Sequence, residues 1–299
     1  MPPEAIRWPL TGLSAPSIEA VDRAPLSVTM NGNAPSAQVG LNDADIVYEW
    51  ENAGAVQLNA LFQSTMPPVA GPVADATLLD TRISTQFRAL LFSKGATSAV
   101  TAVQTQEKLP DLSNDGGLTA PYVSVPRVSR KGVFLDTRKA YTAAQNLGIA
   151  LTGEPARLRF DAAVEATQPI LGVSVPLSDA NTVSWTWKPS AMSYVRRVGA
   201  KEQTDALSHE PLRAKNVVVM WVKKSSLDEA DPSQTASDTA LAGSGQVSVF
   251  RDGVRQDGTW KASSDVPPRF FAEDGAPIAL GLGNTWVEVI PSSASIMLR

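Results

Sequence analysis

The segment LNDADIVYEWENAGAVQLNALFQ, residues 41–63, constrains the fold of this chain more than any other stretch. Ile46, Tyr48 and Trp50 fall on one face of a segment with the two-residue period of a β-strand. Gly54 ends an Asn-Ala-Gly sequence that is typical of a turn, because glycine adopts positive φ at little cost. Ala55–Phe62 continues as a second apolar strand. The segment therefore predicts a β-hairpin or a β-loop-β unit.

The opposite face of the first strand carries acids. Asp45, Val47, Glu49 and Glu51 share it, and three acids on one face repel one another unless water, a cation or a basic partner lies opposite. Two interpretations stay open. The acids form the solvated face of a hairpin, or they form a carboxylate cluster in a cleft.

In the second interpretation the acids are candidates for catalysis or for ligand binding. Glu49 and Asp45 are the candidate catalytic residues, because paired carboxylates act as general acid and base on glycans. Glu51 is a candidate ligand-binding residue. The same acids could hold a hard cation such as calcium, although the chain has no liganding loop of the usual spacing.

Composition excludes several classes of function. The net charge is −4 and only 19% of residues are charged, which argues against a nucleic-acid-binding protein. The absence of cysteine excludes disulfides, thiolate metal sites and cysteine nucleophiles. The single histidine, His209, lies in a turn-like sequence and cannot by itself make a zinc site. No run of about 18 apolar residues predicts a transmembrane helix. We therefore expect neither a metal nor a cofactor.

The length of 299 residues favours two domains. Helical spacing predicts helices over residues 74–87, 98–108 and 137–147 in the first half. After a boundary near residues 160–169 the pattern changes to short strands and turns. The predicted strands are Ile170–Val175, Thr182–Trp187, Met192–Val198, Val217–Val222, Val247–Phe250, Thr259–Lys261, Phe270–Phe271 and Trp286–Ile290. The expected fold is α+β, with an N-terminal α/β domain around a central sheet (1–165) and a C-terminal β-rich domain (166–299). Ser225–Gly245 is polar and predicts a long loop.

Three further side chains are candidate ligand-binding residues. Trp185 and Trp187 alternate onto one strand face, where they form either an aromatic platform for sugar rings or a partly buried pair in the core, and the second alternative is favoured. Arg82 lies on the predicted polar side of the helix over residues 74–87.

Short stretches along nearly the whole chain, in the same order, resemble the YerB-like family of Gram-positive bacteria. The matches are Pro9–Leu13, Gly40–Asn42, Ala44–Glu49, Gly71–Val73, Tyr194, Arg196, Asp205, Lys215–Val219, Gly243–Gly245, Phe250, Asp252-Gly253, Gly258–Lys261, Asp274-Gly275 and Thr285-Trp286. Each match alone is weak, whereas the ordered set is specific. The resemblance implies an exported, usually lipid-anchored protein with a domain of unknown function.

The departures from the family pattern lie mostly in the polar residues of the N-terminal half. Ser36 stands where the family has an arginine, and Val56-Gln57 stands where it has Thr-Arg. Ala74–Thr77 replaces a segment with two arginines, and Gly132–Phe134 replaces Pro-His-Asn. Glycine and apolar positions specify the backbone and core, while arginines and histidines hold anions or transfer protons. The resemblance thus predicts a retained scaffold in which Glu49 and Asp45 lack their basic partners.

The functional expectation is a non-catalytic protein on the outer face of the cytoplasmic membrane. It is expected to bind a wall glycan, a precursor or another envelope protein, and to contact the membrane only through a lipid anchor upstream of Met1. The alternative is a hydrolase of envelope polysaccharide that uses Glu49 and Asp45. A third interpretation is a partner protein for a membrane synthase, with an exposed apolar patch. An enzyme should place Glu49 at the base of a pocket with a second carboxylate about 5–9 Å away.

Overall fold

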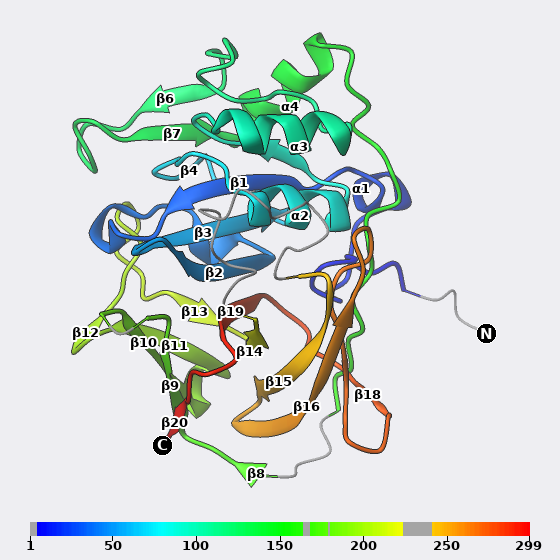
Figure 1. Ribbon diagram of the computed structural model, residues 1–299, viewed down its shortest axis with the longest axis vertical. Coiled ribbons are helices and arrows are strands. Elements are labelled where there is room, and N and C mark those ends of the chain that lie inside the picture. Colours follow the sequence, from blue (N-terminus) through cyan, green and yellow to red (C-terminus); the bar gives the residue numbers. More distant parts are fainter. Residues whose placement is uncertain (1–4, 164–167, 179, 224–240) are drawn as a thin grey trace.

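The computed structural model describes residues 5–163, 168–178, 180–223 and 241–299 (Figure 1). The helices are α1 Ile18–Val21, α2 Leu78–Phe87, α3 Ser98–Gln106 and α4 Thr137–Asn146, with single 3-10 turns at Pro35–Ala37, Leu41–Asp43 and Pro189–Ala191. The strands are β1 Leu26–Asn31, β2 Ile46–Asn52, β3 Ala55–Phe62, β4 Val69–Ala70, β5 Leu90–Phe92, β6 Tyr122–Ser124, β7 Val133–Asp136, β8 Gln168–Pro169, β9 Gly172–Pro176, β10 Thr182–Lys188, β11 Ser193–Val198, β12 Lys201–Glu202, β13 Arg213–Ala214, β14 Asn216–Val222, β15 Gly243–Arg251, β16 Val254–Ala262, β17 Arg269–Phe271, β18 Pro277–Ile278, β19 Thr285–Pro291 and β20 Met297–Leu298.

One eleven-stranded sheet joins the two halves of the chain (Figure 1). Its order is β18-β17-β16-β15-β14-β19-β2-β3-β1-β5, and β8 pairs with β16. The junction between the halves is the parallel pair of β19 and β2, in which Glu288 lies opposite Glu49. Strand β19, from the C-terminal end of the sequence, therefore lies beside the β2–β3 hairpin of the N-terminal half.

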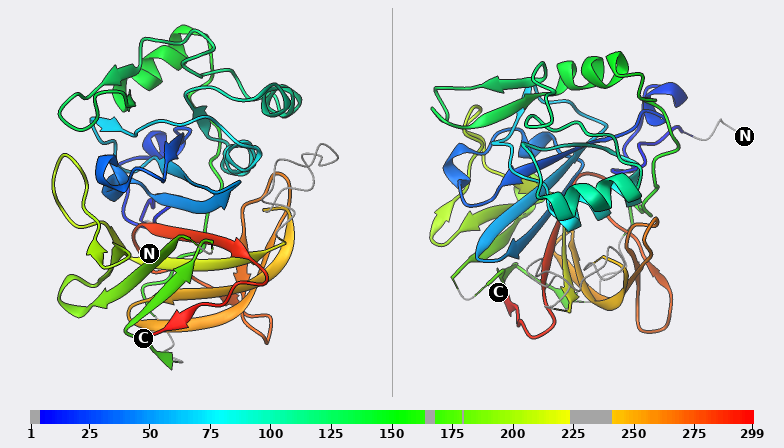
Figure 2. Two further views of the ribbon diagram at one scale, coloured as in Figure 1. Left: turned by 60° about the vertical axis from the view of Figure 1, so that its left-hand side comes forward. Right: turned by 45° about the horizontal axis from the view of Figure 1, so that its top comes forward.

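A second sheet packs on one face of this junction. Its order is β12-β11-β10-β9-β20, with β13 paired to β11. Figure 2 shows the green strands of this six-stranded sheet beside red β19 and yellow-green β14. Trp185 of β10 meets Trp286 of β19 edge to face, with ring centroids 5.1 Å apart. A small three-stranded sheet, β4-β7-β6, completes the N-terminal half.

Strand β2 is buried on both faces. Tyr48 points toward α2 and lies 6.2 Å from Phe87, measured between ring centroids. Val47, on the opposite face, packs in the core cluster that includes Trp185 of the second sheet. The interpretation of its acidic face as solvated is wrong for Glu49, which is only 2% exposed. Alternation showed which side chains share a face, but not that another sheet covers that face.

The predicted hairpin is confirmed as β2 and β3. The strands pair antiparallel up to Asn52 opposite Ala55. Ala53 and Gly54 both have positive φ, 49° and 85°, which matches the right-handed twist of two-residue hairpins. Glu51 accepts a hydrogen bond from the Gly54 amide at 2.6 Å.

Helix α2 begins four residues later than predicted. Thr77 is its N-cap, and a reciprocal capping box links the side chain of Thr77 to the Asp80 amide and that of Asp80 to the Thr77 amide. The residues before it run extended, since the Ala74 amide donates to Thr29 and the Ala76 amide to Gly95. Residues 74–77 are therefore held by strand β1 and by the chain after β5, and only the residues from Leu78 onward form the helix.

The α+β class is confirmed, with helices in the N-terminal half and a β-rich C-terminal half. The predicted boundary between residues 165 and 166 lies outside the described residues, as does most of the predicted 225–245 loop. The described end of that loop, Gly243–Gly245, is not loop but the start of β15. Among the described residues, every helix is too short or too polar to traverse a bilayer.

Candidate functional site

Glu49 has a basic partner. Arg196 of β11 donates to both carboxylate oxygens of Glu49 through one terminal nitrogen, at 2.5 and 2.6 Å. Both side chains are almost fully buried, with 4% of Arg196 and 2% of Glu49 exposed. The expectation that Glu49 lacks a cationic partner is therefore wrong. Arg196 belongs to the second sheet, and the two-residue period of the strands does not indicate where that sheet packs.

Two tryptophans complete the surroundings of this ion pair. Trp286 Nε1 donates to Glu49 at 3.0 Å. The Arg196 guanidinium lies over the Trp286 ring at 5.0 Å and near the Trp185 ring at 6.0 Å. Cation–π contacts of this kind are strongest when water is excluded, so the aromatic walls favour a charged, rigidly oriented arginine.

A second carboxyl group lies beside Glu49. Glu288 is fully buried, its Oε1 accepts from Trp185 Nε1 at 2.8 Å, and within the described residues its Oε2 has no hydrogen-bond partner. Burial raises the pKa of Glu288 well above its ordinary value, and the negative charge of Glu49 raises it further, while Arg196 acts in the opposite direction. The raised pKa favours the protonated form of Glu288. The Glu49–Arg196 ion pair itself carries no net charge.

A chain of amides ties the assembly to the loop after β1. Gln203 accepts a hydrogen bond from Arg196 and donates to the Gln38 side chain. Gln38 donates in turn to the Asn31 carbonyl at 3.1 Å. Buried polar groups that are linked in this way hold one another in a single arrangement.

The ion pair forms part of the wall of a cavity of about 450 Å³ between the two sheets. Small-molecule sites are commonly about 300–1,000 Å³. The other lining residues are Gly32, Asn33, Pro35, Val56, Leu177, Ala180, Asn181, Thr182, Val183, Val198 and Gly199. Glu288 is not among them. The cavity thus offers apolar walls, a few neutral polar groups and the Glu49–Arg196 pair.

Asp45, Glu51 and Arg82 do not join this cavity. Asp45 accepts hydrogen bonds from the amides of Gln63 and Ser64 at 2.6 and 2.8 Å, and from the Ser64 hydroxyl, so it fixes the end of β3. Burial raises the pKa of Asp45 to about 6, against these hydrogen bonds. Glu51 closes the hairpin turn. The three acids are therefore not gathered into a cluster for catalysis or for calcium.

Arg82 is buried instead of lying on a polar surface. It donates to the Ser264 carbonyl at 2.7 Å and lies 3.5 Å from a Glu107 carboxylate oxygen. Trp185 is fully buried, and its role is to hold Glu288. Trp187 packs against Tyr194 with ring centroids 5.0 Å apart. Neither tryptophan lines the cavity.

Sequence reasoning missed two members of the site. Arg196 lies among the residues that carry the resemblance, as does Glu49, but nothing in the sequence places one beside the other. Glu288 is the single acid in the apolar strand Thr285–Pro291. An isolated acid in such a strand is a usable signal, because buried carboxyls need partners. His209 is exposed, as its turn-like sequence indicated.

Comparisons with known proteins give a family and a fold. Residues 10–150 match the N-terminal domain, and residues 173–287 the C-terminal domain, of "Protein of unknown function (DUF3048)". The curated protein "Putative lipoprotein YerB" of Bacillus subtilis (strain 168) is 25% identical over 300 residues, which are 96% of this chain and 86% of that protein. The crystal structure of YerB protein from Bacillus subtilis matches with a TM-score of 0.78 at 22% identity, covering 98% of this chain and 99% of that one.

Proposed function

The chain belongs to the DUF3048 family of proteins of unknown function, and on this premise we propose that it is a non-catalytic binding protein of the cell envelope. Its ligand is an uncharged part of a wall glycan or of a wall precursor, held in the cavity between the two sheets. The observation that carries the proposal is that Glu49 lines this cavity while Arg196 and Trp286 hold its carboxylate in place.

The chemistry of the cavity favours a neutral, hydroxyl-rich ligand. The Glu49–Arg196 ion pair in the cavity wall has no net charge, so a strongly charged ligand gains little attraction from it. A carboxylate has about four acceptor positions and a guanidinium five donor hydrogens, and the Arg196 Nε has no hydrogen-bond partner within the described residues. Sugar hydroxyls both donate and accept. Thr182 and Asn181 add neutral polar groups to the wall.

The same contacts oppose catalysis. A general acid or base must exchange a proton with the substrate, but Glu49 is committed to two short hydrogen bonds from Arg196. Breaking such a buried pair leaves an uncompensated charge. Residues fixed in this way bind a ligand without reorganising, which lowers the entropic cost of association.

The location outside the cytoplasmic membrane rests on the relative. The Bacillus subtilis protein carries the name "Putative lipoprotein YerB", and a lipid anchor would hold such a domain at the membrane surface. A wall glycan or precursor would then be within reach of the cavity.

The test is a pull-down from envelope extract with the purified domain, analysed for glycans and for proteins. Thr182→Trp places a large ring at the exposed mouth of the cavity without touching the ion pair. Ser124→Trp, at the exposed end of β6 in the three-stranded sheet, is the matched control for an added tryptophan. Glycan should be retained by the wild type and by the control, and lost from Thr182→Trp. Equal retention by all three, or retention of proteins alone, contradicts the proposal.

A hydrolase remains a second candidate because one observation favours it. Burial and the neighbouring Glu49 raise the pKa of the Glu288 carboxyl, and neighbouring carboxyls whose surroundings push their pKa values apart are typical of acid–base pairs. Against it, Glu288 does not line the cavity. Release of soluble sugar from wall polymer by the wild type, abolished in Glu49→Gln, would favour the hydrolase.

A further inference from the structure

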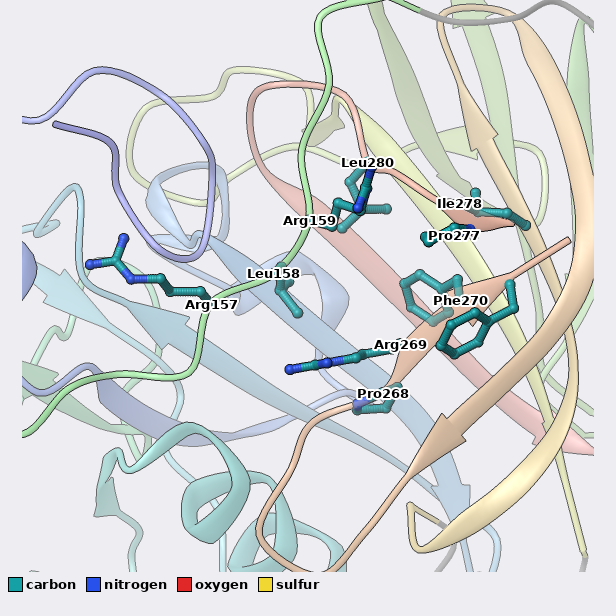
Figure 3. A pocket seen from close by; sticks show the side chains of 10 residues that line it. Arg157, Leu158, Arg159, Pro268, Arg269, Phe270, Pro277, Ile278 and Leu280 are labelled. Carbon is teal, nitrogen blue, oxygen red and sulfur yellow. The ribbon is translucent and has the colours of Figure 1, made fainter. Parts of the chain in front are cut away.

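A second pocket lies far along the large sheet from Glu49, at its β17–β18 edge. It has a volume of about 370 Å³ and is lined by Arg157–Arg159, Pro268–Phe271, Pro277, Ile278 and Leu280 (Figure 3). One wall is the connecting segment that leads from the N-terminal half to the C-terminal half. The other wall is the β17–β18 hairpin. None of these residues takes part in the Glu49 cavity, so this site is independent of the proposed function.

Positive charge gathers at this pocket although the whole chain carries a net charge of −4. Arg157, Arg159 and Arg269 line it, and no acidic residue does. All three are exposed. Within the described part of the chain, none of the three guanidinium groups makes an ion pair or a hydrogen bond. By contrast, Arg82, Arg196 and Arg251 are each bound to carboxylates or carbonyls. Unpaired guanidinium groups around a hollow are suited to phosphate oxygens, which they bind in bidentate fashion.

The centre of the pocket is apolar. Phe270, Ile278 and Leu280 are buried at its base, with 8%, 4% and 1% of their surfaces exposed. Figure 3 shows Arg159 and Arg269 on either side of Leu158, while Arg157 extends away from Phe270 and Ile278. Two arginines thus flank an apolar floor, and a third adds charge from one side.

The backbone holds these walls in place. The Leu280 amide donates to the Arg159 carbonyl at 2.9 Å, and the Asp161 amide donates to the Leu280 carbonyl at 2.9 Å. The Leu158 amide donates to the Pro9 carbonyl at 3.1 Å. The connecting segment is therefore fixed to the sheet edge and to the N-terminal chain. A pocket whose walls are preformed loses little entropy when it binds a ligand.

We propose that this pocket binds a phosphorylated amphiphile, with the phosphate on Arg159 and Arg269 and the hydrocarbon portion against Phe270, Ile278 and Leu158. The charge of the rim selects an anion, and the apolar floor selects a hydrocarbon segment over a free inorganic ion. A phospholipid head region and a phosphorylated isoprenoid share this chemistry. A purely polar anion would leave the apolar floor exposed to water, and a neutral lipid would leave the arginines unpaired.

The test is calorimetric titration of the full chain with butyl, hexyl and octyl phosphate at concentrations where each is monomeric. Hexanol and inorganic phosphate serve as probes for the two halves of the ligand. The variants are Arg159→Gln/Arg269→Gln, which removes the two flanking charges, and Leu158→Ala, which removes half-exposed apolar surface. Arg138→Gln, on an exposed position of α4, is the control for losing an arginine away from the pocket.

Affinity should increase about three- to fourfold for each methylene that enters the pocket. The double arginine variant should bind octyl phosphate at least about tenfold more weakly, because charge-assisted hydrogen bonds are lost. Leu158→Ala should flatten the dependence on chain length, and Arg138→Gln should bind like the wild type. Hexanol and inorganic phosphate should each bind more weakly than hexyl phosphate.

Three results would overturn the proposal. The first is no heat of binding for octyl phosphate. The second is an unchanged affinity in the double arginine variant. The third is inorganic phosphate binding as tightly as octyl phosphate, which would leave an anion site without an apolar component. Thermal unfolding of each variant, measured in parallel, separates loss of binding from loss of the fold.

Discussion

Replacing Arg196 by methionine tests the physical basis of the Glu49 site. Methionine keeps much of the apolar stem but removes the two hydrogen bonds to Glu49, at 2.5 and 2.6 Å, and the contact with the Trp286 ring. Glu49 is then left with one donor, Trp286 Nε1. Removing one partner of a buried ion pair typically costs about 3–5 kcal/mol of unfolding free energy.

The structure allows a sharper estimate, because an isolated buried carboxyl takes up a proton. The ordinary glutamate pKa is about 4.3, so holding a proton on such a group at pH 7 costs about 3.7 kcal/mol at 1.36 kcal/mol for each pH unit. At pH 5 the same cost is about 1 kcal/mol. The folded variant binds more protons than its unfolded state, so its stability relative to the wild type falls as the pH rises above about 4.3.

The assay is urea unfolding followed by tryptophan fluorescence, at pH 5 and at pH 7. The free energy of unfolding of Arg196→Met should be lower than that of the wild type. This deficit should be about 2–3 kcal/mol larger at pH 7 than at pH 5. The double variant Glu49→Gln/Arg196→Met is the control, because glutamine needs no proton. Its deficit should be nearly the same at both pH values. A deficit for Arg196→Met that does not change with pH, or that stays below about 1 kcal/mol, would refute the description of Glu49 as buried and dependent on Arg196.

Three further changes probe single features of the structure. Burial raises the pKa of Asp45 to about 6, so the stability linked to this group is present below about pH 4 and is lost as the pH rises through 6. The free energy of unfolding of Asp45→Asn, relative to that of the wild type, should therefore rise by about 2 kcal/mol between pH 4 and pH 7 in urea unfolding, whereas parallel profiles would contradict the raised pKa. Trp185→Phe removes the donor to Glu288 and should cost about 1–3 kcal/mol in the same assay; a neutral effect would show that this hydrogen bond is dispensable. Gly40→Ala should lower the melting temperature more than Gly148→Ala, since both glycines have positive φ but only the Cβ at position 40 meets a carbonyl oxygen at 2.9 Å; equal shifts would argue against the close approach.

Local sequence patterns predicted the elements well where the pattern depends on the segment itself. Ala55–Phe62 has the predicted bounds as β3, and α4 begins at Thr137 as expected. The family resemblance is confirmed along the chain. These successes share a cause, because strand alternation, turn glycines and helix caps act over a few residues.

The contacts that make the site are not local. Trp286 and Glu49, which are hydrogen bonded, are 237 residues apart in the sequence. No period in either strand indicates that β19 pairs with β2, or that β11 lies over both. The absent family arginines suggested a site without positive charge, yet Arg196 supplies that charge from the second sheet. The residue types of the site were therefore visible in the sequence, while their convergence was not.

The most direct test of the central claim is a single incubation of the purified domain with soluble wall glycan, in which bound ligand and released sugar are both measured over time. The wild type should bind glycan to saturation and release no new reducing ends. Glu49→Gln should bind more weakly, because the neutral side chain no longer holds Arg196 by charge. Steady release of sugar by the wild type that disappears in Glu49→Gln would contradict a binding role and assign Glu49 to catalysis.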